Sequence, residues 1–250
     1  MAANLHVHAP MTMAAVQARH RWLLPTVAAV FVLLAVGAWF DTLPWDRLIT
    51  DAAVGARTSS TDQIFLAISR LGSTPVVFTV SATAAALAWR RCPRLALAIV
   101  VIALARPLAE WTLKELVGRD RPSGDRLVRG KGPSFPSGHP LATVASWGVL
   151  PLVAALYTRR RALWWSIAIG VWVLATIVAV SRVWLGVHWA SDVVAGLLLA
   201  VLGVAAAERC VRSAHAPDLP CCQERHELDS SLTTSRSALS TLQSSTQPRN

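Results

Sequence analysis

The sequence is poor in charged residues and in cysteine for its length. Only 15% of the 250 residues are charged and 54% are hydrophobic, whereas a soluble domain carries charge on about a quarter of its residues. This composition argues against a soluble cytosolic enzyme and against a disordered chain. The four cysteines, at positions 92, 210, 221 and 222, show no framework spacing and no paired CxxC sets, so we predict neither disulfides nor a zinc site. We interpret the adjacent Cys221 and Cys222 as reduced thiols, with lipidation as the alternative.

Acidic residues are scarce as well. The chain has 14 Asp and Glu against 24 Lys and Arg, which gives a net charge of +10. A basic excess of this size is also found in nucleic-acid-binding proteins, but here the basic residues lie at the ends of apolar runs and not in an RNA-binding motif. We therefore predict no nucleic-acid partner.

Long apolar runs are what the sequence has in abundance. A helix needs roughly 20 apolar residues to cross a bilayer. Six segments qualify, of which the second is short and weak: Trp22–Phe40, Thr74–Trp89, Leu95–Leu113, Leu141–Tyr157, Leu163–Val180 and Ala190–Ala207. They predict an all-α integral membrane protein with six transmembrane helices between residues 22 and 207. The first run is too long for a signal-peptide core and no convincing cleavage site follows it, so we expect it to remain as a helix.

Basic clusters in the loops predict the orientation in the membrane. Four clusters fall on one side of the six predicted spans, with Glu208 as the one acid among them: Arg19, Arg21, Arg90, Arg91, Arg94, Arg159, Arg160, Arg161, Arg209 and Arg212. By the positive-inside rule this side is the cytoplasm, so we expect a plasma (inner) membrane protein with both termini inside. Residues 1–21 then form a cytoplasmic segment, and the Ser-, Thr- and Gln-rich residues 208–250 form a disordered cytoplasmic tail. In the outer loop Asp41–Arg70, apolar stretches such as Gln63–Leu71 are expected to form short interfacial helices.

One predicted outer loop carries positive charge where the topology disfavours it. Residues 114–131 hold six Lys and Arg against three Asp and Glu, a net charge of +3. Lys114 and Arg121 bracket Glu115–Asp120, and Pro122 follows. Two such cations suit the non-bridging oxygens of a phosphoryl group. An ordinary basic surface loop is the alternative.

Two histidine-containing segments lie at predicted outer span ends. Pro136-Ser137-Gly138-His139 leads into an apolar run, and the free N–H groups and dipole of a helix start form an anion site. A serine-capped turn explains the same segment, but it does not require a histidine.

His188 and Asp192 are four residues apart at another helix start, so their side chains share a face. A carboxylate that holds one imidazole nitrogen leaves the other nitrogen free to attack or to take a proton. The alternatives are a headgroup-seeking histidine, a helix-start aspartate favoured by the dipole and, for the nearby Arg182, a snorkelling anchor.

Arg106, Glu110 and Lys114 follow one another at intervals of four within and just after the third run. Ionisable groups at membrane depth are costly and usually face the protein interior. We interpret Arg106 and Glu110 as a pair that orients Lys114, with a purely structural ion pair as the alternative.

Taken in order, three motifs resemble the signature of the type 2 phosphatidic acid phosphatase (PAP2) superfamily, and no position of it is missing. The motifs are Lys114-x6-Arg121-Pro122, Pro136-Ser137-Gly138-His139 and Ser181-Arg182-x5-His188-x3-Asp192. The resemblance implies a PAP2-like helical bundle over roughly residues 22–207. It also implies that His188 attacks phosphorus to form a phosphohistidine while Asp192 holds its other nitrogen, and that His139 protonates the leaving oxygen and then activates water.

The resemblance further implies five phosphate-binding residues: Lys114, Arg121, Ser137, Gly138 and Arg182. We expect a supporting set around them: Arg106, Glu110, Pro122, Pro136 and Ser181. No metal or cofactor is expected, because Glu110 and Asp192 are the only carboxylates within the spans after the first, too few for a hard-cation cage.

The expected reaction is hydrolysis of a lipid phosphate or diphosphate at the outer membrane face. By analogy with bacterial family members, a polyprenyl diphosphate such as undecaprenyl diphosphate is the first choice, followed by phosphatidic acid or phosphatidylglycerol phosphate. A phosphoryl transferase with the same site is the main alternative. A transporter lined by Arg106 and Glu110 would not need the histidines, and the soluble vanadium-dependent haloperoxidases that share the signature would not need six apolar runs.

Overall fold

The computed structural model describes residues 13–213 of the chain, and the side chains of residues 23–205. Every regular element in this part is an α-helix. The expectations for most of the segment 1–21, for most of the tail 208–250 and for Cys221 and Cys222 lie outside the described residues.

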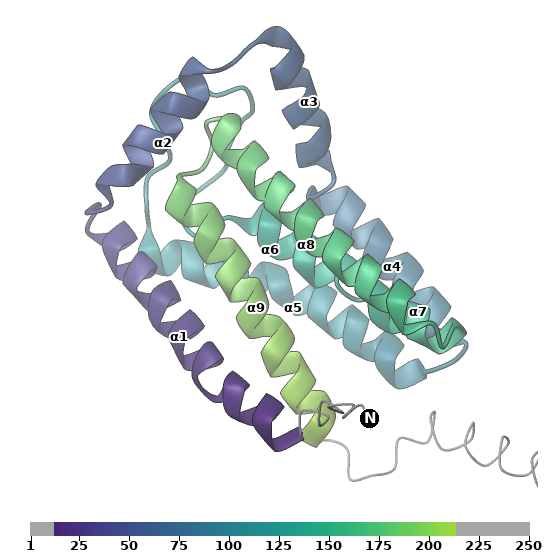
Figure 1. Cartoon of the computed structure of the whole chain (residues 1–250). Helices are drawn as coiled ribbons and strands as arrows, with labels where there is room; N and C mark the ends of the chain where they lie inside the picture. Colours follow the sequence, from purple (N-terminus) through teal and green to yellow (C-terminus); the bar gives the residue numbers. More distant parts are fainter. Residues whose placement is uncertain (1–12, 214–250) are drawn as a thin grey trace, which may run out of the picture. The chain divides into compact units, whose positions relative to one another are not determined.

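The helices follow the predicted apolar runs (Figure 1). In chain order they are α1 (Met13–Trp39), α2 (Pro44–Gly55), α3 (Ser59–Arg70), α4 (Thr74–Trp89), α5 (Pro93–Val117), α6 (Gly138–Trp147), α7 (Leu150–Tyr157), α8 (Arg161–Trp184) and α9 (Ala190–Ser213). The fourth predicted run is divided between α6 and α7. The division follows from Pro151 in the first turn of α7, which has no N–H to donate to the carbonyl of Trp147.

Three stretches of helix are long and apolar enough to cross a membrane: Pro93–Val117, Gly138–Tyr157 and Arg161–Trp184. Two bent pairs bring the number to five if each pair is one span, namely Leu23–Trp39 with Pro44–Gly55, bent by 82°, and Ser59–Arg70 with Thr74–Trp89, bent by 40°. Ala190–Ala205 is a shorter apolar helix. Membrane helices are therefore present, and the number six stays a prediction.

Large apolar side chains cover the outside of the spanning helices. Leu104 and Leu108 on α5 and Trp165 and Ile169 on α8 are all at least 60% exposed. Water would penalise such continuous apolar faces, whereas lipid chains do not, because the helices already satisfy their backbone hydrogen bonds internally. These faces are suited to the bilayer.

Small residues allow the helices to pack closely inside. Ala84 and Ala88 on α4 meet Ala96 and Ile99 on α5 in one buried cluster, as is typical of membrane helix pairs. A second cluster joins α6, α8 and α9 through Leu141, Val144, Ala175 and Ala200.

Two of the predicted basic clusters share one end of the bundle. Tyr157, at the end of α7, donates its hydroxyl to the carbonyl of Leu87 at 2.8 Å, and the Arg91 guanidinium lies 5.1 Å from the Tyr157 ring centroid. The turns that carry Arg90–Arg94 and Arg159–Arg161 are thus neighbours.

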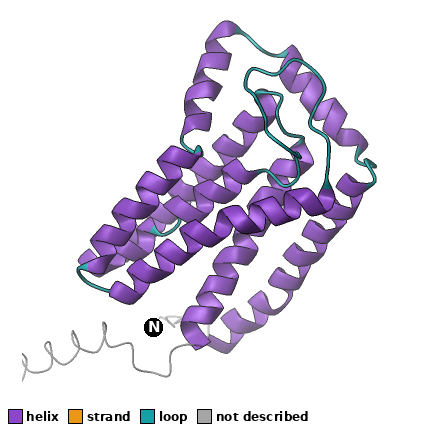
Figure 2. Ribbon diagram, turned by 180° about the vertical axis from the view of Figure 1, so that it is seen from behind, coloured by secondary structure: helices purple, strands orange, loops and turns teal. Residues whose placement is uncertain are grey.

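The opposite end of the bundle collects the motifs. There α5 and α8 end, α6 and α9 begin, and a long loop joins α5 to α6 (Figures 1 and 2). The segment 41–70, in which short helices were predicted, forms α2 and α3 at this end. Arg57 between them donates Nε to the carbonyl of Trp184 at 2.8 Å, and Trp184 donates Nε1 to Asp62 at 2.9 Å. These bonds tie the α2–α3 segment to the end of α8.

Candidate active site

The start of α9 places His188 beside Asp192. His188 Nδ1 lies 3.4 Å from Asp192 Oδ2, and both side chains are almost fully buried. Asp192 also accepts the N–H of Trp189 at 2.9 Å. It therefore reaches back from the first turn of the helix to the residue before it, as in one half of a capping box. The Asp192 carboxylate thus caps the helix and lies beside the imidazole, without a hydrogen bond to His188 Nδ1.

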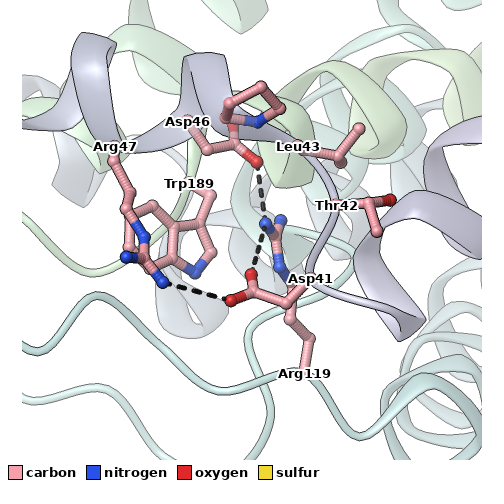
Figure 3. Close-up of a pocket in the computed structure, with 8 residues that line it drawn as sticks. Asp41, Thr42, Leu43, Asp46, Arg47, Arg119 and Trp189 are labelled. Atoms are coloured by element: carbon pink, nitrogen blue, oxygen red, sulfur yellow. Dashed lines mark hydrogen bonds and ion pairs between the residues drawn. The ribbon is translucent and has the colours of Figure 1, made fainter.

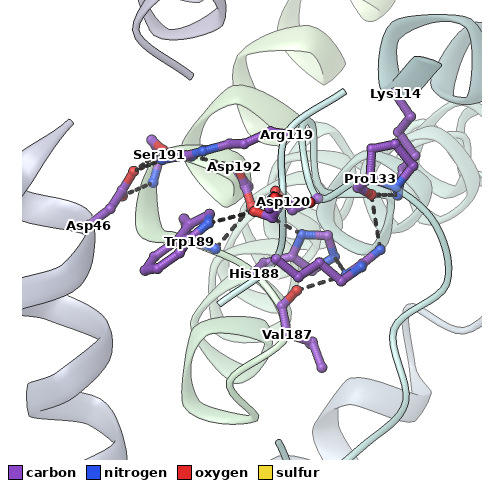
Figure 4. A network of polar contacts seen from close by, with 12 residues as sticks. Asp46, Lys114, Arg119, Asp120, Pro133, Val187, His188, Trp189, Ser191 and Asp192 are labelled. Atoms are coloured by element: carbon purple, nitrogen blue, oxygen red, sulfur yellow. Dashed lines mark hydrogen bonds and ion pairs between the residues drawn. The ribbon is translucent and has the colours of Figure 1, made fainter. Parts of the chain in front are cut away.

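Hydrogen bonds bring the three motifs together. Ser137, from the second motif, donates its N–H to the carbonyl of Asp192 at 2.9 Å. Arg121, from the first motif, places Nη1 3.2 Å from His188 Nε2. Three segments that are far apart in the sequence thus meet at the start of α9. Figure 4 shows His188 and Asp192 there, with Lys114 from the first motif nearby.

Arg121 is held by backbone carbonyls of two loops. It donates to Val187 at 2.7 Å, to Gly132 and Lys131 at 2.9 Å each and to Pro133 at 3.1 Å. The guanidinium therefore ties the α5–α6 loop to the segment before His188. Arg121, which we predicted to bind phosphate, thus also fixes the position of the α5–α6 loop.

The predicted ladder on α5 forms in the structure. Arg106 Nη1 lies 2.8 Å from Glu110 Oε2, and Lys114 Nζ lies 3.3 Å from Glu110 Oε1. Lys114 also reaches the carbonyl of Pro133 at 3.5 Å. Glu110 therefore holds Lys114 toward the same loop that Arg121 holds.

Arg182, in the last turn of α8, is buried and donates Nη1 to the hydroxyl of Ser69 on α3 at 2.5 Å. Its Nε and the hydroxyl of Ser137 are buried atoms without a hydrogen-bond partner among the described residues. An unpaired buried donor costs about 1–3 kcal/mol. Such a cost is understandable where the donors serve to bind an anion.

His139 is the second residue of α6 and is half-buried. The positive charges of Arg182 and Lys114 act on it, and it also interacts with the His188 ring, which places it among the same residues. Gly138 and the buried Ser137 precede it at the helix start, where free N–H groups are found.

Burial lowers the pKa of His188 well below its usual range, and the positive charges of Arg121, Arg182 and Lys114 lower it further. The imidazole is therefore neutral at physiological pH. A neutral ring is what a nucleophile requires.

Pro122, Pro136 and Ser181, the remaining motif residues, contact the protein itself. Pro122 and Pro136 are buried, and a cis peptide precedes Pro136. The hydroxyl of Ser181 donates to the carbonyl of Val178 on its own helix at 2.6 Å. Of the predicted supporting residues, Ser181 thus directs its hydroxyl to the backbone and not to the histidines.

Sequence reasoning missed two residues of the site, Asp46 and Arg119. Arg119 was counted only in the net charge of the outer loop, yet it is 5% exposed and pairs with both Asp46 and Asp192. Part of the positive charge expected to meet an anion is thus already balanced by carboxylates. The position of Arg119, two residues before Arg121 and within the first motif, was the one signal available.

Comparison with known proteins gives the same family as the motifs. Residues 94–215 match the model of the PAP2 superfamily. The chain is 29% identical over 165 residues to phosphatidylglycerophosphatase B of Bacillus subtilis (strain 168), which spans 63% of this chain and 78% of that protein. It is 36% identical over 115 residues to "Putative undecaprenyl-diphosphatase YbjG" of Escherichia coli (strain K12), which spans 44% of this chain and 54% of that protein.

Two solved structures share the fold. One is a transmembrane PAP2-type phosphatidylglycerolphosphate phosphatase from Bacillus subtilis, with a TM-score of 0.68 and 23% identity over 78% of this chain and 98% of that one. The other is LpxE from Aquifex aeolicus, with a TM-score of 0.52 and 18% identity over 67% of this chain and 96% of that one. Residues 94–215 thus match the PAP2 superfamily, and the chain is similar in sequence and in fold to membrane lipid phosphatases.

Proposed function

We propose that the chain hydrolyses a lipid phosphate or diphosphate through a phosphohistidine on His188, at the outer face of the plasma membrane and without a metal ion. The observation that carries this proposal is the neutral, buried His188, with Asp192 on one ring nitrogen and Arg121 at the other.

In the first step, His188 Nε2 attacks phosphorus and the bond from phosphorus to the leaving oxygen breaks. His139 gives its proton to that oxygen, which leaves as a lipid alcohol or, from a diphosphate, as a lipid monophosphate. Asp192 stabilises the positive charge that develops on the His188 ring. Lys114, Arg121 and Arg182, with Ser137 and the N–H of Gly138, bind the phosphoryl oxygens, where charge is concentrated in the transition state.

In the second step, His139 takes a proton from water, the water oxygen attacks phosphorus and the P–N bond breaks. Inorganic phosphate leaves, and both histidines return to their starting states. One histidine must begin neutral and the other protonated, so this cycle predicts a bell-shaped pH–rate profile.

The charge balance supports a reaction without a metal. Asp192 is paired with Arg119, and Glu110 is paired with Arg106 and Lys114. A divalent cation would have to compete with these fixed positive charges for both carboxylates. The phosphate instead finds its counter-charges in the basic side chains.

The distribution of charge supports the orientation. The turns with Arg90–Arg94 and Arg159–Arg161 are neighbours at one end of the bundle, and the motifs lie at the other. With the arginine-rich end in the cytoplasm, the histidines lie at the outer boundary, where a lipid presents its headgroup. We propose six spans, both termini inside and an undecaprenyl-type diphosphate as first substrate, with phosphatidylglycerol phosphate or phosphatidic acid next.

The test uses the purified full chain in liposomes with undecaprenyl diphosphate, phosphatidylglycerol phosphate or phosphatidic acid. We expect His188-dependent phosphate release that survives EDTA, and acid-labile labelled phosphate on the protein after a rapid quench. His188→Ala should abolish both signals, whereas Arg90→Ala, at an exposed site in the opposite turn, should keep them. Release by His188→Ala at the wild-type rate, or loss with EDTA and rescue by magnesium, would contradict the proposal.

A further inference from the structure

Arg119 and Asp46 form a buried ion pair, and Arg119 contacts the oxygen of Asp192 that faces away from His188. Asp46 on α2 is 1% exposed, although α2 belongs to none of the three motifs. Arg119 Nη2 lies 2.8 Å from Asp46 Oδ2, and Arg119 Nη1 lies 2.9 Å from Asp192 Oδ1. The guanidinium thus bridges two buried carboxylates that are 146 positions apart in the numbering, from 46 to 192 (Figure 4).

The bridge occupies the oxygen of Asp192 that does not face the histidine. Oδ1 receives Arg119, whereas Oδ2 receives the N–H of Trp189 and faces His188 Nδ1. Rotation of the carboxylate would break both sets of contacts. Arg119 therefore fixes which oxygen is presented to the imidazole.

Asp46 also holds the start of the helix that carries Asp192. It accepts the N–H of Ser191 on Oδ1 at 2.8 Å and the Ser191 hydroxyl on Oδ2 at 2.5 Å. Ser191 in turn accepts a hydrogen bond from Arg119 Nη1 at 2.7 Å. An anion at a helix N-terminus is favoured by the free N–H groups and the dipole, so the Asp46 carboxylate fixes the first turn of α9 from another helix.

Asp41, the other carboxylate near Arg119, is less suited than Asp46 to hold the guanidinium in place. Asp41 lies 3.7 Å from Arg119, but its side chain is 62% exposed and also pairs with Arg47. A cavity of about 400 Å³ lies on this side of Arg119, lined in part by Asp41, Asp46 and Trp189 (Figure 3). Water screens Asp41 there, whereas Asp46 interacts with Arg119 in a buried setting where charge is much less screened. The Trp189 ring, with its centroid 5.4 Å from the Arg119 guanidinium carbon, covers the pair.

We propose that Arg119 and Asp46 are positioning residues for the nucleophile: Arg119 fixes and partly neutralises Asp192, and Asp46 holds Arg119. This inference rests on the function proposed above and assigns the outer helix α2 a part in it. It makes the protonation of His188 depend on a carboxylate from a helix that contains none of the motif residues.

The two residues should affect His188 in opposite directions. In Arg119→Gln the negative charge of Asp192 is no longer compensated, which stabilises the imidazolium. In Asp46→Asn the full charge of Arg119 acts on Asp192, which favours the neutral ring. The other charged or titratable groups around His188 are unchanged in both variants: Lys114 from α5, Arg121 from the loop, His139 from α6 and Arg182 from α8.

The experiment measures kcat, KM and the pH dependence of kcat/KM with liposome-bound full chain and the best lipid phosphate. We expect Arg119→Gln to lower kcat about 10- to 100-fold, as for outer residues that orient a functional histidine, with KM within about twofold of wild type. Its acid limb should move to higher pH by about 0.5 unit or more, and that of Asp46→Asn should move to lower pH. Arg119→Lys should recover part of kcat.

The double variant decides whether Asp46 acts through Arg119. In the Arg119→Gln background, Asp46→Asn should move the acid limb no further, because the charge it acts on is gone. The amide introduced by Asp46→Asn still offers an acceptor and donors to Ser191, so this variant is expected to fold, and thermal unfolding of each purified variant checks it. A merely structural role would lower the melting temperature without opposite pH shifts.

The outcomes separate the two proposals. Wild-type activity that depends on His188, together with unshifted acid limbs and unchanged kcat in the Arg119 and Asp46 variants, overturns the positioning role alone. Absence of His188-dependent release by the wild type overturns the proposed function, and the positioning role with it.

Discussion

Gly138 lies against the carboxylate of Glu110 so closely that a Cβ atom at Gly138 would sit 1.9 Å from Glu110 Oε1. Since Glu110 also holds Lys114 at 3.3 Å, the helix start of the second motif packs on the carboxylate that orients the lysine of the first. The glycine is thus needed for this contact, and not only for the turn.

Gly138→Ala should therefore abolish activity or lower it at least about 100-fold, because the methyl group must push Glu110 and Lys114 out of place. Gly170→Ala, on α8, is the matched control, since nothing lies within 4 Å of its added Cβ. That control should keep full activity and gain stability of about 0.5–1 kcal/mol, as for Gly→Ala in a helix. Equal activity of the two variants in the liposome assay would contradict this role of Gly138.

Glu110→Gln tests the ladder on α5. The amide cannot balance the charges of Arg106 and Lys114, which are only 10% and 14% exposed at their side chains. We expect Lys114 to lose its fixed position and kcat/KM to fall about 10- to 100-fold, together with a lower thermal stability because two half-buried cations are left uncompensated. The control is Glu115→Gln, at an exposed position of the same helix, which should change neither quantity. Unchanged kcat/KM in Glu110→Gln would show that the pairs are structural only.

The contrast between these pairs and the Asp46–Arg119 bridge shows which contacts could be predicted from the sequence. Glu110 and Lys114, like His188 and Asp192, are four residues apart on a helix, so helical periodicity alone brings their side chains together. Asp46 and Arg119 are 73 residues apart, and nothing local indicates that α2 packs over the motif loop. The resemblance to the PAP2 superfamily and most helices were predictable from motifs and apolar runs, whereas contacts made by docking of the outer helices were not.

The contact between Ser69 on α3 and Arg182 on α8 is another that the sequence could not predict. It lies 113 residues before Arg182 and accepts the Arg182 Nη1 bond from α3. Ser69→Ala should leave Arg182 in place but less well oriented, and the loss of one charged hydrogen bond of about 1.5–3 kcal/mol corresponds to roughly a 10- to 150-fold loss in kcat/KM. Ser60→Ala, at an exposed position of the same helix, is the control. Activity that does not distinguish the two serine variants would contradict an orienting role for Ser69.

The acid limb of the pH profile reports His188. Because burial and three neighbouring cations lower its pKa well below the ordinary value, the ring stays neutral as the pH falls through about 6.5, where a free histidine takes up a proton. We expect the acid limb of kcat/KM that belongs to the nucleophile to lie below about pH 6.5. The same shift has a consequence for stability. Below about pH 6.5 the unfolded chain binds a proton at this position more readily than the folded one, so the contribution of His188 to folding stability falls as the pH is lowered. A limb at or above the ordinary histidine value would show that His188 is not held neutral.

The orientation can be tested with single cysteines in a variant whose four native cysteines are replaced. Gly124, in the exposed α5–α6 loop, and Arg90, in the exposed α4–α5 turn, lie at opposite ends of the bundle. Because arginine-rich turns stay in the cytoplasm, a cysteine at position 124 should react with a membrane-impermeant maleimide in intact cells. A cysteine at position 90 should react only after permeabilisation. The reverse pattern would place the histidines on the cytoplasmic side, and the enzyme would then draw its lipid phosphates from the inner leaflet.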